Sequence, residues 1–165
     1  MSTSVSDATH RTNETAPAPL IVVGMDGSEG AREALQWAVE EAGYRNAKVR
    51  AVLAWGYPVV IGMEQSAFVL DQETVEKGAR EELRIAVDTA LDSPGEASAV
   101  EQVVTMGSAA DALVEQSKIA DLVVVGARGH GGFLGLRLGS VSSQVTHHAH
   151  CPVVVVRKES FREER

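Results

Sequence analysis

A continuous apolar run, Leu122 to Val125, leads into a glycine-rich segment and then into a helical pattern. No other stretch restricts the possible folds as much. Consecutive apolar, mostly β-branched residues are typical of a parallel strand that is covered on both faces. After the glycines, apolar residues recur at helical spacing from Ser140, whose hydroxyl is predicted to cap the first turn. The stretch therefore predicts a buried strand, a loop and a helix within an α/β domain.

The loop in this stretch combines glycines with positive charge. Glycine tolerates positive φ and lets backbone N–H groups approach a bound group, and a helix N-terminus adds partial positive charge. No Asp or Glu occurs between Leu122 and Lys158, although 23 acids in 165 residues would place roughly five there by proportion. A loop that merely turns would not need this bias, so we expect an anion site. Gly126 closes the strand, the loop glycines are Gly129, Gly131, Gly132, Gly135 and Gly139, and the cationic side chains are Arg128, His130 and Arg137.

The remaining chain alternates strand and helix patterns. Strands are predicted at 20–25, 49–55, 99–106 and 152–156, with helices at 28–43, 71–92 and 109–114. This alternation predicts a five-stranded parallel sheet of order 3-2-1-4-5 with helices on both faces, and the more polar third strand at an edge. Asp26 ends the first strand, so it should meet the glycine loop at the switch point of the sheet, where such folds bind ligands. A turn aspartate that bonds its own backbone is the alternative for Asp26.

Composition bounds the class of protein. We expect one domain at 20–158, a disordered leader at 1–19 that is rich in Ser, Thr, Ala and Pro, and a charged tail at 159–165. The net charge of −8 argues against nucleic acid or an anionic membrane as the partner. No apolar run reaches the length of a membrane span, and Cys151 is the single cysteine. A soluble, cytoplasmic protein is the expectation.

The spacing Gly126-x-x-Gly129, nine residues, then Gly139-Ser140 resembles the nucleotide loop of the ATP-binding universal stress proteins, over roughly 19–157. The resemblance implies ATP or a related adenine nucleotide, with or without Mg²⁺, and a role in stress adaptation through an unidentified protein partner. It also implies slow hydrolysis at most, and a homodimer paired through the edge strand Val153 to Val156. Carried over to this chain, the nucleotide-binding residues are Asp26, Trp55 or Ala54 beside the adenine, Gly126, Arg128, Gly129, Gly139, Ser140, Val141 and Ser142.

The sequence also bears on several other functions. A Walker A loop needs a lysine that this loop lacks, and a receiver domain needs an aspartate where Met106 stands. His147, His148, His150 and Cys151 could suggest a metal, but histidines at a helix end more often interact with its dipole, so no metal site is predicted. Three alternatives stay open: a slow ATPase or phosphotransferase with Mg²⁺ held through Asp26, a cyclic AMP-binding module, and a dimeric interaction protein with an empty pocket.

Overall fold

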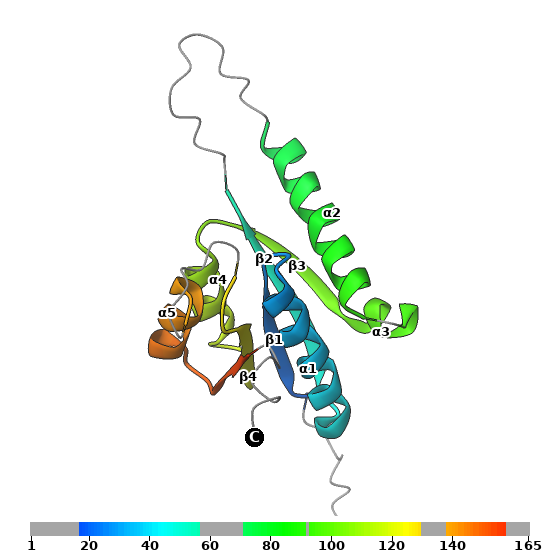
Figure 1. The fold of residues 1–165 in the computed structure, drawn as a ribbon, viewed down its shortest axis with the longest axis vertical. Coiled ribbons are helices and arrows are strands. Elements are labelled where there is room, and N and C mark those ends of the chain that lie inside the picture. Colours follow the sequence, from blue (N-terminus) through cyan, green and yellow to red (C-terminus); the bar gives the residue numbers. More distant parts are fainter. Residues whose placement is uncertain (1–16, 57–70, 92, 130–137, 158–165) are drawn as a thin grey trace, which may run out of the picture.

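The computed structural model describes residues 17–56, 71–91, 93–129 and 138–157, which form one α/β unit (Figure 1). Most of the predicted leader, the segment 57–70, the predicted tail, His130, Arg137 and three of the loop glycines lie outside these residues. Among the described residues, no helix is both long and apolar enough to cross a membrane. The elements are β1 (Leu20–Met25), α1 (Glu29–Arg45), β2 (Lys48–Trp55), α2 (Gln72–Ala90), α3 (Pro94–Ala99), β3 (Glu101–Met106), α4 (Ala109–Gln116), β4 (Leu122–Gly126), α5 (Ser140–His148) and β5 (Val153–Val156).

The five strands form one parallel sheet in the order β3-β2-β1-β4-β5, which confirms the predicted topology. Val23 of β1 stands between Ala51 of β2 and Val124 of β4 in the register. The carboxyl ends of β1 and β4 therefore lie side by side. This juxtaposition is the switch point of the sheet, because the chain leaves β1 toward one edge and enters β4 on the way to the other.

Two hydrophobic clusters cover the two faces of the sheet. Residues of α1 and α2 pack on one face, and residues of α4 and α5 pack on the other, as their placement in Figure 1 also shows. The strands supply both clusters alternately: Ile21 and Val23 belong to the first, whereas Val22 belongs to the second. Because both faces are covered, β1 and β4 need apolar residues at every position, which explains their unbroken runs.

Local signals define several of the helix ends. The Ser28 hydroxyl accepts from the N–H of Ala31 at 3.2 Å and so caps α1, and the Asp71 carboxylate accepts from Thr74 N–H at 2.9 Å at the start of α2. The predicted stop of α1 at Gly43 is wrong. The helix continues to Arg45 and ends at Asn46, which adopts the left-handed conformation with φ 52°. Asparagine tolerates that conformation, so it serves as the stop signal here.

A short helix between α2 and β3 was missed. The prediction placed a plain break after α2 and began the third strand at Ala99, but Pro94 starts α3, with Ala97 buried, and β3 begins at Glu101. Proline ends one helix and yet suits the first turn of the next, because its fixed φ is helical and that position needs no N–H donor. Pro94 therefore both prevents α2 from continuing and begins α3.

Candidate functional site

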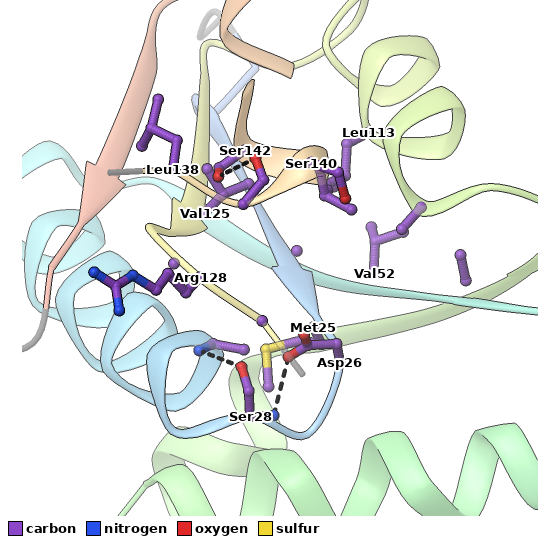
Figure 2. A pocket seen from close by; sticks show the side chains of 18 residues that line it. Met25, Asp26, Ser28, Val52, Leu113, Val125, Arg128, Leu138, Ser140 and Ser142 are labelled. Atoms are coloured by element: carbon purple, nitrogen blue, oxygen red, sulfur yellow. Dashed lines mark hydrogen bonds between the residues drawn. The ribbon is translucent and has the colours of Figure 1, made fainter. Parts of the chain in front are cut away.

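A cavity of about 330 Å³ opens at the carboxyl ends of β1 and β4 (Figure 2). Its described lining comes from β1, β2 and β4, from the start of α1, and from α4 and α5. Eight of the nine sequence-predicted site residues line it: Asp26, Gly126, Arg128, Gly129, Gly139, Ser140, Val141 and Ser142. The switch point thus brings together residues that lie more than a hundred positions apart in the chain.

Trp55, the ninth predicted residue, lies elsewhere. Its side chain is 8% exposed and belongs to the cluster under α1 and α2, together with Leu53. Side chains alternate between the faces of a strand, so Ala54 points to the other face and lines the cavity. Ala54, the smaller of the two residues predicted to lie beside the adenine, therefore lines the cavity, and Trp55 is a core residue.

One wall of the cavity is apolar and uncharged. Val52 and Ala54 of β2, Leu113 and Ala109 of α4, and Val125 of β4 all line it. The sequence pattern predicts a helix over 109–114 but does not show that Ala109 and Leu113 line this wall. Apolar side chains at this position could accept the faces of a flat organic ring and exclude water from them.

Asp26 is a turn aspartate and also lines the cavity. Its Oδ1 accepts a hydrogen bond from the N–H of Ser28 at 2.9 Å, across Gly27 at φ 77°, which is the turn aspartate. Its carboxylate also lines the cavity and lies against Gly129, where a Cβ would be only 2.1 Å from Oδ2. The turn therefore holds an acidic group against the glycine loop.

Gly126 and Gly129 are needed for close packing rather than for unusual backbone angles. We expected positive φ in this loop, but Gly126, Gly129 and Gly139 do not adopt it; Gly139 has φ −73°. A Cβ on Gly126 would instead lie 2.7 Å from the carbonyl atoms of Gly30, and a Cβ on Gly30 would lie 2.7 Å from the Arg128 carbonyl oxygen. The first turn of α1 packs directly against the end of β4. Gly30 was not predicted as a site residue, although a glycine in the first turn of a helix can indicate that another backbone segment packs closely against it.

The N-terminus of α5 faces the cavity without a side-chain cap. Gly139, in an extended conformation, is the N-cap, so Ser140 is the first helical residue and the predicted Ser140 cap is wrong. The first N–H groups of a helix have no intrahelical acceptor. In α1, α2 and α4 a side chain accepts one of them, but among the residues that the structure describes no side chain does so in α3 or α5. The first turn of α5, from Ser140 to Ser142, lines the cavity instead.

Charge in the described lining comes from Asp26 and Arg128 alone. Arg128 is exposed, and Figure 2 shows its side chain pointing away from Asp26 and Ser140. Ser142, in contrast, is buried, and its hydroxyl bonds to backbone carbonyls of the loop ends. The described residues hold no group of three or more His, Cys, Asp or Glu side chains that could bind a metal ion.

Together these features define an open α/β protein with a cavity at its switch point, apolar on one wall and lined on another by an uncapped helix N-terminus. The family model described as "Universal stress protein family" matches residues 20–157, and the chain belongs to that family. A universal stress protein of Mycobacterium tuberculosis (strain H37Rv) is 37% identical over 138 residues, which cover 84% of this chain and 45% of that relative. This chain therefore spans about half the length of the curated relatives it matches.

Solved structures agree with the family assignment. The universal stress protein UspA from Lactobacillus plantarum superposes with a TM-score of 0.66 at 24% identity, covering 84% of this chain and 97% of that one. A universal stress protein solved in complex with cAMP gives a TM-score of 0.59 at 29% identity, covering 85% and 97%. The sequence resemblance to the family is thereby confirmed.

Proposed function

We propose that this protein binds an adenine nucleotide in the cavity at the switch point and acts as a regulatory protein in stress adaptation. The single observation that carries this proposal is that one cavity is lined both by the uncapped N-terminus of α5 and by an apolar wall. A nucleotide has the matching chemistry, with a flat base and an anionic phosphate in one molecule. Family membership and the cAMP complex of a relative support it.

The three parts of the ligand would meet different parts of the cavity. The base lies against Ala54, Val52 and Leu113. The phosphate nearest the ribose accepts from the N–H groups at the start of α5, near Ser140. The Asp26 carboxylate is an acceptor that repels phosphate, so it is suited to a ribose hydroxyl or a base amino group.

ATP is our first choice among the adenine nucleotides, with AMP and cyclic AMP as alternatives. Calorimetric titration of the purified protein with ATP, AMP, cyclic AMP and adenosine would test this, with GTP as the base control. Mass spectrometry of natively purified protein would show any nucleotide that stays bound. Saturable binding of an adenine nucleotide is the expected result, and no binding of any of them would overturn the proposal.

A second candidate is a slow ATPase or phosphotransferase, which Asp26 favours because a carboxylate in the cavity could hold Mg²⁺. Phosphoryl transfer needs metal ligands and a group that positions the nucleophile. Asp26 is the one carboxylate of the described lining, and that lining contains no lysine. We therefore propose slow hydrolysis at most. Turnover measured with Mg²⁺ for the wild type and Asp26→Asn separates the candidates, because a Mg²⁺-dependent enzyme would lose its activity in the variant.

We further propose that the protein acts as a homodimer paired through β5, in the cytoplasm, on a protein partner. Val153 to Val156 form an edge strand of the sheet, and all four side chains are only half-buried in the single chain. An apolar edge strand presents unpaired backbone groups that another chain can pair with. Two copies related by a two-fold axis could pair β5 with itself and close the interface.

A further inference from the structure

The backbone of Ala127 connects the two ends of the glycine loop. The Ala127 carbonyl accepts a hydrogen bond from the N–H of Gly139 at 2.8 Å and a second from the Ser142 hydroxyl at 3.1 Å. The N–H of Ala127 donates to the Val156 carbonyl of β5 at 2.7 Å. The end of β4 therefore fixes the start of α5 relative to the sheet, across the eleven residues that lie between Ala127 and Gly139 in the sequence.

The Ser142 hydroxyl is fully engaged in this arrangement. Ser142 is 3% exposed, and its Oγ lies 3.1 Å from both the Ala127 and the Gly139 carbonyl oxygens. A serine hydroxyl carries a single proton, which these two carbonyls share, so no second donor remains for an anion in the cavity. An oxygen without a free proton would repel a phosphate.

We propose that Ser142 is a positioning residue: its hydroxyl ties Ala127 to the first turn of α5 and thereby aims the uncapped N–H groups of that turn into the cavity. This inference rests on the proposed nucleotide-binding function for the identity of the anion. It differs from the direct nucleotide contact that the family resemblance implies for Ser142. The tie matters because the backbone N–H groups of a helix N-terminus bind an anion only when they point at it.

Ser142→Ala tests the tie, with Ser143→Ala as the matched control. Ser143 is the next serine of the same helix, and its side chain is not part of the tie. The first measurement is the hydrogen exchange rate of the Gly139 amide in ligand-free protein. We expect Ser142→Ala to speed that exchange roughly threefold to tenfold, the range for losing an ordinary hydrogen bond. Ser143→Ala should leave the rate unchanged, and an unchanged rate in Ser142→Ala would overturn the proposal.

The second measurement compares the affinities of each variant for AMP and for adenosine. If the tie aims the anion site, its loss in Ser142→Ala should weaken AMP binding on the order of threefold to tenfold and leave adenosine binding unchanged. Equal losses for both ligands would mean a general structural role, and a loss for AMP with normal Gly139 exchange would mean direct contact; both results overturn the positioning role. If the wild type binds neither ligand, the proposed function fails, while the exchange rate still decides whether Ser142 holds the loop ends.

Discussion

The Asp26 carboxylate occupies the space that a side chain on Gly129 would need. A Cβ built on Gly129 lies 2.1 Å from the Oδ2 atom of Asp26, far inside contact distance. One residue follows β1 and the other follows β4, so their contact joins the two halves of the switch point. The acidic group is held from one side by the turn at Ser28 and bounded on the other by a glycine.

Gly129→Ala should displace the Asp26 side chain and weaken nucleotide binding by about tenfold or more, as expected when a polar ligand contact is lost. Titration calorimetry with the best-binding nucleotide measures this. Gly43→Ala is the control, because a Cβ there meets nothing within 4 Å. It should leave affinity unchanged and add about 0.5–1 kcal/mol to the free energy of unfolding, since alanine is the better helix former. Equal affinities in wild type and Gly129→Ala would remove Asp26 and the loop from the site.

Gly126→Ala should destabilise the fold itself. The new methyl group would meet backbone atoms of Gly30 at 2.7 Å, and backbone cannot rotate away as a side chain can. Overpacking of this kind costs about 1–3 kcal/mol, which denaturant unfolding would show as a lower midpoint. At Gly139 the nearest atoms are at 3.6 Å, so Gly139→Ala should fold with nearly normal stability. Equal destabilisation by the two changes would contradict the close packing of α1 on β4.

Ala54→Leu should fill the apolar wall and lower the affinity for every adenine ligand, including adenosine. The added atoms point into the cavity, so the free energy of unfolding should change little. Trp55→Phe, one position along the strand, should do the reverse: it leaves binding intact and lowers stability by about 1–3 kcal/mol, because it leaves a gap in a packed core. Equilibrium binding and denaturant unfolding of both variants measure the difference. If Trp55→Phe weakens binding while Ala54→Leu does not, the assignment of the faces of β2 is wrong.

Val155→Pro should convert the proposed dimer to a monomer without disrupting the sheet. The carbonyls of Pro152 and Val156 accept hydrogen bonds from β4. Successive residues of a strand direct their backbone groups to opposite sides, so those of Val153 and Val155 point away from β4, toward the open edge. Proline at 155 removes an outward donor, whereas Val154→Pro acts on the inner ladder and should lower stability instead. Light scattering after size exclusion, at tens of micromolar, gives the mass of each. A monomeric wild type at that concentration would contradict the dimer.

The Cys151 thiol should react slowly with thiol reagents near neutral pH. Burial raises its pKa, with the charge of Asp121 acting in the same direction. The thiolate is the reactive form, so a raised pKa lowers its fraction at any pH below that value. The midpoint of the pH–rate profile for alkylation should lie above that of a cysteine in a denatured chain. A midpoint below it would mean that the thiol is activated.

The order of the sheet and the place of the cavity could be predicted from the sequence by itself. Unbroken β-branched runs such as Val123 to Val125 mark strands buried on both faces, and right-handed crossovers leave few ways to arrange them. The glycine spacing that begins at Gly126 and the absence of acids after Leu122 indicated an anion site, and the family resemblance extended this to eight of the residues that line the cavity.

The tertiary structure decided which neighbouring residue faces the cavity and why the glycines are needed. One residue of register separates Ala54 from Trp55, and only the packed sheet shows that the tryptophan belongs to the core. Gly126 is required by its contact with Gly30, a residue 96 positions away, which no local pattern could reveal. The tie between Ser142 and Ala127 has the same origin. Local patterns specify which elements form, but contacts between distant segments exist only once those elements have packed.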